Sequence, residues 1–344
     1  MKKFDFLVVG GGPAGSTFAY LMAKSGASVL VVDFKRRIGT PVQCAEFVPL
    51  QLKYLYEEFF SDGSVVQKVK DMVHYTPWGE VVVMPSEGFV LDREVFDYNI
   101  AQLAQSHGAV YSLRTLFLDV EDGYYICQNV DTRETFKVKA DVLVGADGAR
   151  SKVAKLSGQS VRNYLTTAQR TYRLTQPVED LLVFFRDYIP GGYGWVFPKG
   201  NLANVGVGVD VDYKLNPTKV LNLFVNELMS QGLIEGEPVK ATGGWIPADG
   251  LLDVVRERIA LIGDAGGFCH PITGGGIANA VISGSMLARA LLEDSLETYE
   301  EMAKDIFGDS LSRAASKRKL LKTWENLETL IPKTWIAFRE YYAD

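Results

Sequence analysis

The sequence of 344 residues has few of the side chains on which metal centres and disulfide frameworks depend. It contains three histidines and three cysteines, and the cysteines lie far apart, at Cys44, Cys127 and Cys269. An odd number at such wide spacing fits neither a disulfide framework nor a zinc site. We therefore expect no metal site and, by default, a reducing cytoplasmic location.

An excess of positive charge and a long apolar run are also missing. Lys and Arg number 36 against 42 Asp and Glu, a net charge of -6, whereas nucleic-acid binding draws on a basic surface. Ser283, Ser285 and Arg289 interrupt the apolar stretch 277–292, which is shorter than the ~20 residues of a membrane span. Four near-consecutive glycines and a proline break the apolar amino terminus, unlike a secretory signal. We expect neither a nucleic-acid partner nor a transmembrane helix.

A complete dinucleotide-binding pattern is present at the amino terminus. An apolar strand over residues 6–9 leads into a G-x-G-x-x-G turn and a helix, and a second apolar strand, 29–32, ends in an acid. The glycines permit a tight turn, close approach of a pyrophosphate and close helix packing, and the acid can accept hydrogen bonds from a ribose. A glycine-rich turn without a ligand is the alternative. The predicted contacts are Gly10, Gly12, Pro13, Ala14, Gly15, Asp33, Phe34 and Lys35.

Two later segments distinguish a flavin from a nicotinamide cofactor. Residues 140–151 form an apolar strand that ends in Ala-Asp-Gly, and residues 258–268 form another that ends in Gly-Asp and precedes the Gly-rich segment 271–277. In this order the segments resemble the second and third FAD motifs of oxidoreductases with the para-hydroxybenzoate hydroxylase fold. The resemblance covers about residues 1–295 and implies bound FAD. It adds the predicted cofactor contacts Cys44, Ala45, Arg93, Ala146, Asp147, Gly148, Gly263, Asp264, Gly274, Gly275, Gly276 and Ile277.

The resemblance also implies individual roles for these residues. Asp264 would bond the ribityl hydroxyls, and the amides of 274–276 would face N1 and the C2 carbonyl of the flavin. The helix that starts near Ile277 would add its dipole. Arg93 would lie on the phosphate side, with a solvated ion pair as its alternative. Asp147 would shape its loop, or be a structural turn residue.

Two further elements narrow the subfamily. Pro41-Val-Gln-Cys-Ala-Glu46 and Tyr193-Gly-Trp-Val-Phe-Pro-Lys199, the latter followed by Gly206-Val-Gly208, are similar to elements of the geranylgeranyl reductase family. That family saturates prenyl double bonds, so the resemblance implies a prenyl reductase. The predicted catalytic residues are Cys44, Tyr193 and Trp195. The alternatives are an inert thiol for Cys44 and core packing for the aromatic stripe.

Two neighbouring side chains have open roles. Glu46 is either a structural carboxylate or a site residue. His270, beside the predicted flavin loop, either donates a proton or hydrogen bond or merely packs.

The implied partners are a prenylated lipid or quinone and an electron donor. Because no second G-x-G-x-x-G unit for a nicotinamide cofactor is evident, the donor is either NAD(P)H that binds transiently or a ferredoxin-like protein. Peripheral membrane contact is a further hypothesis. It rests on a basic run beside apolar tail residues, although such a run can simply be a solvated helix face. An aromatic hydroxylase of the same fold and a non-redox or lipid-binding flavoprotein are the alternative functions. The run and the tail residues are Arg313, Lys317, Arg318, Lys319 and Lys322, and Trp324, Leu327, Leu330, Ile331 and Trp335.

The length and the 47% hydrophobic content predict about two domains in an α/β fold with an α+β second domain. We expect a discontinuous Rossmann-like FAD domain over 1–60, 91–160 and 252–295. A mixed or antiparallel sheet over 61–90 and 161–251 should bind the substrate, and 296–344 should be helical. Residues 79–84, 180–185 and 203–209 read as strands and 215–233 as a helix.

Overall fold

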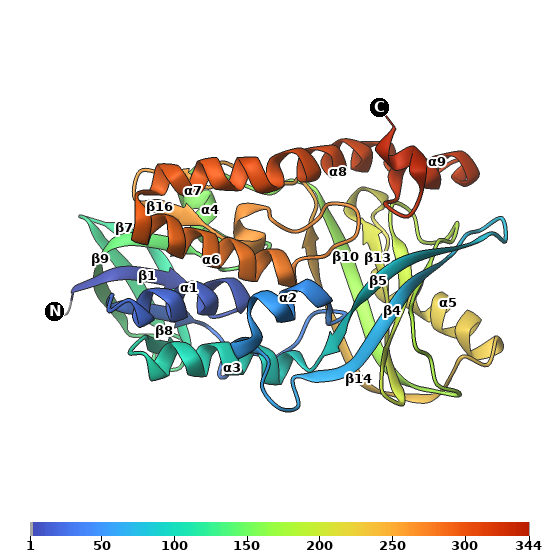
Figure 1. Ribbon diagram of the computed structural model, residues 1–344, viewed down its shortest axis with the longest axis horizontal. Helices are drawn as coiled ribbons and strands as arrows, with labels where there is room; N and C mark the ends of the chain where they lie inside the picture. The colour runs from blue at the N-terminus through green and yellow to red at the C-terminus, as the bar shows by residue number, and fades with distance from the viewer. Residues whose placement is uncertain (1–2, 344) are drawn as a thin grey trace.

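The computed structural model describes residues 3–343, and these form an elongated molecule with a mixed β-sheet at each end (Figure 1). Each sheet has eight strands within the described residues. The C-terminal helices run along one side of the molecule from the first sheet to the second (Figure 1). The α/β fold class predicted from the sequence is therefore confirmed.

The first sheet has a parallel centre. Strand β1 pairs in parallel with β2 and β9, and β16 and β6 extend the parallel region on the two sides. Its apolar runs are buried because helices cover the sheet. The pairing aligns Val9 with Val32 and Gly145, so the carboxyl ends of the strands share one edge. The strands are β1 (Lys3–Val9), β2 (Val29–Asp33), β6 (Val110–Leu113), β7 (Thr115–Glu121), β8 (Tyr124–Asn129), β9 (Thr135–Gly145), β15 (Val255–Arg256) and β16 (Ile259–Leu261).

Helix α1 packs between α3 and α6 (Figure 1). A Cβ on Gly284 of α6 would lie 2.4 Å from the Ala14 carbonyl oxygen, so glycine permits this close contact of α6 with α1. The helices and short turns of this half are α1 (Pro13–Lys24), α2 (Leu50–Leu55), η1 (Glu57–Phe59), α3 (Arg93–Ser106), α4 (Lys152–Leu156), η3 (Gly263–Gly266) and α6 (Ile277–Glu293).

The second sheet is antiparallel except for the parallel pair β11 and β4. Its strand order is β14-β10-β13-β12-β11-β4-β5-β3. The mixed sheet predicted for this half is confirmed. The strands are β3 (Phe47–Pro49), β4 (Val65–Tyr75), β5 (Val81–Leu91), β10 (Tyr164–Leu174), β11 (Leu181–Phe184), β12 (Tyr193–Lys199), β13 (Leu202–Asp210) and β14 (Ile234–Pro247).

The two faces of the second sheet have different partners. On one face, Val196 and Val205 belong to an apolar cluster with Phe224 of helix α5 (Pro217–Ser230). The predicted helix is confirmed there: Pro217 starts it, and the side chain of Asn216 caps it by accepting from the Thr218 amide. The opposite face is directed to the first half, and we call it the site face.

Element boundaries differ from the sequence-based ranges in two places. The strand expected over 79–84 begins at Val81 and continues to Leu91, because residues 76–79 form the hairpin turn. Strand β3, which lies within the range predicted for the cofactor domain, pairs with β5 and so extends the second sheet. Residues 1–2 and 344 of the predicted ranges lie outside the described residues. Among the described helices, none is long and apolar enough to cross a membrane.

The C-terminal helices cover part of the site face. Trp324, Leu327 and Trp335 belong to one apolar cluster with Phe185 and Tyr193 of the second half. These helices and turns are α7 (Leu296–Ala303), the π-helical turn η4 (Lys304–Gly308), α8 (Asp309–Leu320), α9 (Leu327–Thr334) and η5 (Arg339–Tyr342); a further turn, η2 (Val211–Tyr213), follows β13.

The basic run in and directly after α8 is not one exposed face. Arg318 is buried and donates to Asp210 at 2.9 Å, and Lys322 binds Asp210 and Asp212 at 3.2 and 2.6 Å. Two of the five charges therefore hold α8 against the second half. The interpretation of this run as one solvated basic surface is wrong, because tertiary ion pairing consumes part of it.

Candidate functional site

The glycines of the amino-terminal turn lie at the carboxyl edge of the first sheet, and close packing requires two of them. A Cβ on Gly15 would lie 2.0 Å from the Gly10 carbonyl oxygen, and one on Gly10, whose φ is 103°, would lie 2.3 Å from the Ala146 oxygen. Gly12 differs, because its added Cβ would meet nothing within 4 Å. The start of α1, which no side chain caps, therefore borders open space at Gly12.

Two acids brace this edge through backbone amides. Asp33 accepts from the amides of Gly11 and Lys35, both at 2.8 Å. Asp147 accepts from the Ser151 hydroxyl at 2.5 Å and from the Lys152 amide at 2.6 Å, which orders the start of α4. Each acid thus shapes its own turn. For Asp147 this is the loop-shaping role considered from the sequence.

The third aspartate is free of such partners. Burial raises the pKa of Asp264 to about 6, while the Arg93 guanidinium acts in the opposite direction. Within residues 3–343 its carboxylate makes no hydrogen bond or ion pair. A Cβ on Gly276 would lie 3.1 Å from its Oδ1, and one on Gly263 would lie 3.0 Å from Ala14 at the start of α1. The acid therefore lies between the amino-terminal turn and the glycine loop before α6.

These features fit a flavin dinucleotide. The uncapped start of α1 beside Gly12 can receive a pyrophosphate, and the unpaired Asp264 can accept hydrogen bonds from hydroxyls. Gly276 caps α6 without a side-chain hydrogen bond, so that helix also presents its amino end to the site. Sequence-distant segments thus form one continuous edge with the polar groups that such a cofactor requires.

The Cys44 loop crosses from this edge to the site face. The Glu46 amide donates to Cys44 Sγ at 3.2 Å, and the Cys44 carbonyl accepts from Gln169 Nε2 at 2.9 Å. Burial raises the pKa of the Cys44 thiol, so it is protonated at neutral pH. The thiol proton has no hydrogen-bond acceptor among the described residues.

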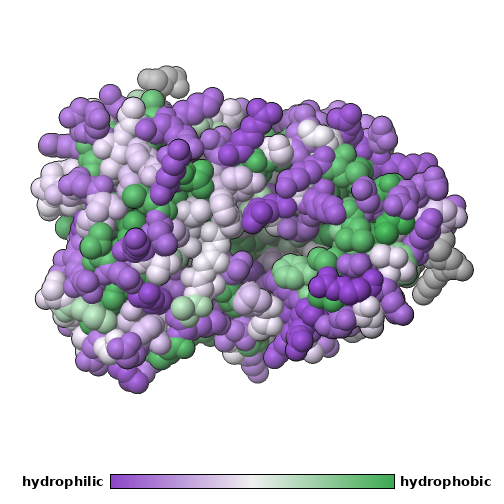
Figure 2. Space-filling view, turned by 180° about the vertical axis from the view of Figure 1, so that it is seen from behind, coloured by the Kyte–Doolittle hydropathy of each residue, from purple (hydrophilic) through white to green (hydrophobic). Residues whose placement is uncertain are grey.

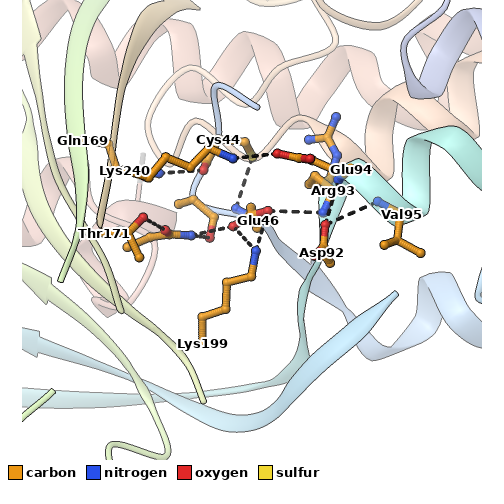
Figure 3. A network of polar contacts seen from close by, with 12 residues as sticks. Cys44, Glu46, Asp92, Arg93, Glu94, Val95, Gln169, Thr171, Lys199 and Lys240 are labelled. Carbon is orange, nitrogen blue, oxygen red and sulfur yellow. Dashed lines mark hydrogen bonds and ion pairs between the residues drawn. The ribbon is translucent and has the colours of Figure 1, made fainter. Parts of the chain in front are cut away.

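Glu46 joins three segments (Figure 3). Its carboxylate accepts from Lys199 Nζ at 3.0 and 2.8 Å, from Asn204 Nδ2 at 2.7 Å and from the Arg93 amide at 3.2 Å. It is buried and has a φ of 76°, in the left-handed region that few non-glycine residues adopt. Of the two roles considered for Glu46, the structure shows a structural pairing that fixes the loop carrying Cys44.

Tyr193 and Trp195 lie on the site face because residues two apart on a strand share a face. Their rings are 5.8 Å apart. Trp195 is opposite Gly206 in the register, and a Cβ there would lie 2.2 Å from the indole, so the bare glycine makes room for the ring. The same steric argument gives a physical reason for the spacing of Trp195 and the Gly206-Val-Gly208 element.

Hydrogen bonds tie both aromatic side chains to the rest of the site. The Tyr193 hydroxyl donates to the Thr273 carbonyl of the glycine loop, and Trp195 Nε1 donates to Gln169 Oε1 at 2.9 Å. Since Gln169 also donates to the Cys44 carbonyl, it links Trp195 to the Cys44 loop. The structure therefore brings the three predicted catalytic residues and the glycine loop together.

Arg93 and His270 have local partners. Arg93 forms a bidentate ion pair with Asp97 at 2.7 and 2.8 Å, so its guanidinium is buried and not solvated. Nδ1 of His270 accepts from the amides of Ile272 and Thr273. Burial lowers the pKa of His270 to about 4, so the ring is neutral at pH 7. This geometry orders the glycine loop.

The sequence does not single out Gln169 and Asn204 as residues of the site. Each is a buried polar residue on a strand, and Asn204 lies in the otherwise apolar run Ala203-Asn-Val. An isolated polar residue in an apolar strand was the one available signal. The partners, Cys44 and Glu46, are more than 120 residues away in sequence, so only the fold could identify them.

This arrangement defines a flavin-dependent oxidoreductase. Residues 8–72 match the model of an NAD(P)-binding Rossmann-like domain, and residues 164–246 match the geranylgeranyl reductase catalytic domain. A digeranylgeranylglycerophospholipid reductase of Methanopyrus kandleri is 32% identical over 95% of this chain and 88% of its own length. The chain belongs to the geranylgeranyl reductase family.

Solved structures agree with this assignment. A geranylgeranyl bacteriochlorophyll reductase-like protein from Thermoplasma acidophilum has a TM-score of 0.87 and 27% identity, covering 98% of this chain and 92% of that one. A probable FAD-dependent monooxygenase from Pseudomonas aeruginosa has a TM-score of 0.70 at 17% identity, covering 96% and 100%. The second likeness shows the fold alone.

Proposed function

We propose that this protein binds FAD and saturates double bonds in a prenyl chain carried by a lipid or quinone. One observation carries the proposal: Gln169 and Glu46 tie the loop of Cys44 to the strand of Tyr193 and Trp195, directly beside the glycine loop. The name of the Methanopyrus relative, a digeranylgeranylglycerophospholipid reductase, supports a lipid as the carrier.

Bound FAD would supply the hydride for the double bond. The start of α1 at Gly12 would hold its pyrophosphate, with Asp33 and Lys35 near the ribose. Asp264 would accept from the ribityl hydroxyls, and the amides of 274–276 would face the flavin ring. Arg93, which the resemblance places on the phosphate side, is paired with Asp97 and lies within electrostatic reach of Asp264, so we propose that it acts beside the ribityl chain instead.

An isolated alkene has no carbonyl to polarise, so the protein must position it, exclude water and hold a proton nearby. Trp195 and Tyr193 would form the positioning wall. The Tyr193 proton is committed to the Thr273 carbonyl, and His270 is neutral with Nδ1 already accepting. Cys44 keeps an uncommitted thiol proton, and neutral His270 carries its proton on Nε2, which has no acceptor within residues 3–343. We propose that Cys44 tunes which bond is reached, while an ordered water serves equally as proton source.

NAD(P)H or a ferredoxin-like protein is the proposed electron donor. Transient contact with a membrane surface follows as a separate proposal, because a diprenyl lipid resides there. The exposed charges of the basic run, such as Arg313 and Lys319, are still available for such contact.

The decisive assay is anaerobic. The purified protein, reduced with dithionite, is mixed with a geranylgeranyl lipid or menaquinone, and we expect products heavier by two hydrogens per bond in mass spectrometry. Cys44→Ser should retain FAD and some turnover with a changed product distribution. Hydroxylation of a phenol with oxygen and NAD(P)H, and no prenyl saturation, would establish the hydroxylase instead. Full flavin occupancy without any turnover would favour a non-redox flavoprotein.

The cofactor itself is tested separately. Acid or heat should release intact FAD, because no histidine or cysteine stands in a recognised flavinylation pattern. FMN, covalent flavin or NAD alone in the released material would contradict the FAD assignment.

A further inference from the structure

A cavity of about 250 Å³ lies on the site face of the second sheet, beside the Cys44 loop. Figure 2 shows the molecule from behind Figure 1, where the visible surface is hollowed near the middle and hydrophilic side chains border part of the hollow. The cavity is lined by Val42, Glu46, Gln169, Thr171, Lys199, Leu202, Asn204, Val239, Lys240 and Thr242.

The cavity adjoins the proposed reaction site. Gln169 forms part of its wall and bonds both Trp195 and the Cys44 carbonyl. Lys199 is four residues beyond Trp195 on the same face of β12, which corresponds to about 13 Å along the strand. The cavity and Trp195 of the aromatic wall are therefore separated by about four residues of strand β12.

Most of its free charged hydrogen-bonding groups are donors. The Glu46 carboxylate already accepts four hydrogen bonds, two of them from Lys199. An ammonium group has three protons to donate. Lys199 uses two of them on Glu46, and Lys240 uses one on Glu94 at 2.7 Å (Figure 3), so one proton of Lys199 and two of Lys240 remain free. The Thr242 hydroxyl makes no hydrogen bond within residues 3–343. The walls thus offer donors, whereas their strongest acceptor is saturated.

We propose that this cavity binds the phosphate of the lipid headgroup, as a glycerophosphate. The inference rests on the proposed prenyl reductase function and names the subsite that distinguishes phospholipids from neutral prenyl lipids. The side chains of Lys240 and Glu94, which form an ion pair, are 48% and 38% exposed. Because an exposed ion pair is weak, Lys240 can rotate to a phosphate at little cost. Lys199, Lys240 and Thr242 donate to the phosphate oxygens.

The site face also has an apolar region next to this cavity. Beyond Trp195 the same face becomes apolar, and Phe185, Tyr193 and Trp335 form one cluster under the C-terminal helices. A headgroup in the cavity places the prenyl chain along Trp195 toward that apolar cluster. Polar and apolar ends of the substrate thus meet matching surfaces on either side of the reaction site.

The first experiment compares digeranylgeranylglycerol phosphate with digeranylgeranylglycerol, using the holoenzyme reduced by dithionite. We expect Lys240→Ala and Thr242→Val to lower the ratio of kcat/KM for the phosphorylated lipid over the neutral lipid, Lys240→Ala by roughly tenfold. Lys219→Ala, an exposed lysine on α5, is the matched control and should keep the parental ratio. Equal ratios in Lys240→Ala, Thr242→Val and the control would overturn the proposal.

The second experiment does not depend on turnover. Calorimetry with soluble glycerol phosphate should show binding to the parent protein and weakened binding to Lys240→Ala. If neither lipid is saturated but glycerol phosphate still binds in this way, the headgroup site stands and the proposed reaction fails. If both lipids are saturated and glycerol phosphate does not bind, the reaction stands and the site is overturned.

Two further arms separate other sources of phosphate. Inorganic phosphate should compete with the phosphorylated lipid in the parent more strongly than in Lys240→Ala. A rise of the KM for NADPH in Lys240→Ala, with an unchanged lipid ratio, would assign the cavity to the phosphates of the reductant and overturn the headgroup assignment.

Discussion

The two halves of the site are built from different parts of the chain. At the edge of the first sheet, the site consists of glycines, uncapped helix starts and backbone amides, and each of these groups comes from a short motif. On the site face, the site consists of buried side chains such as Glu46 and Gln169, and their hydrogen-bond partners lie far away in sequence. A surface made from backbone depends on the absence of side chains, whereas one made from side chains depends on the register of strands.

The comparison predicts its largest effect at two glycines of the same turn. Gly15→Val places atoms within 2.0 Å of the Gly10 carbonyl oxygen, so we expect a protein that does not fold and holds no flavin. Gly12→Ala should fold as the parent does, because its φ of -74° suits alanine and its Cβ meets no atom. We expect it to lose FAD affinity at least roughly tenfold, since the methyl enters the phosphate space.

Thermal unfolding of the flavin-free proteins and titration with FAD separate these outcomes. Unchanged FAD affinity in a folded Gly12→Ala protein would show that the pyrophosphate lies elsewhere.

In the second half, the largest effect is expected at the buried ion pair that attaches α8. Asp210→Ala leaves Arg318 buried without a carboxylate and should lower the free energy of unfolding by about 3–5 kcal/mol. Glu94→Ala, which breaks the exposed pair with Lys240, should cost at most about 1 kcal/mol. Denaturant unfolding measures both, and equal costs would mean that α8 is held by its apolar contacts alone.

The aromatic wall should show a smaller effect that leaves the first half untouched. Gly206→Ala adds a Cβ 2.2 Å from the Trp195 indole, so the ring must move. We expect FAD to stay bound and turnover to fall by about a hundredfold, the loss that a displacement near 1 Å can cause. Trp195→Ala removes the ring that positions the substrate, so turnover should fall to a similar extent.

The double variant Gly206→Ala/Trp195→Ala supplies the control. It should be no worse than Trp195→Ala alone, because both changes act through one ring. Additive losses would show that Gly206 acts on something other than Trp195.

The smallest effect concerns pH and Asp264. Burial raises its pKa from 3.8 to about 6, so the flavin-free protein should lose stability as the pH rises from about 4 to 6. Hydroxyls that donate to the carboxylate favour the charged form. FAD affinity should therefore increase as the pH rises from 5 to 7, by about fivefold if binding returns the pKa to 5 and by more if binding lowers it further.

The matched variant is Asp264→Asn, which keeps the shape of the side chain and removes the titration. Its FAD affinity should be flat over this pH range in fluorescence titrations. A parental slope in Asp264→Asn would assign the pH dependence to another group.

Much of the first half could be predicted because its signals are local. The strand that ends at Val9, the helix that starts at Pro13 and the strand that ends at Asp33 are read from apolar runs and glycine spacing within 33 residues. The segment around Asp264 follows the same pattern. In the second half, only a family resemblance points to Tyr193 and Trp195, and no local signal points to Gln169.

The dinucleotide-binding edge follows from the order of residues along the chain, because turns, helix starts and the absence of a Cβ are properties of consecutive residues. That Glu46 fixes the Cys44 loop to Lys199 and Asn204, and that Arg318 is an internal ion-pair partner and not a surface charge, follows only from the folded arrangement. Those outcomes depend on which strands and helices pack together. Packing joins residues through space, and no local pattern of side chains records it.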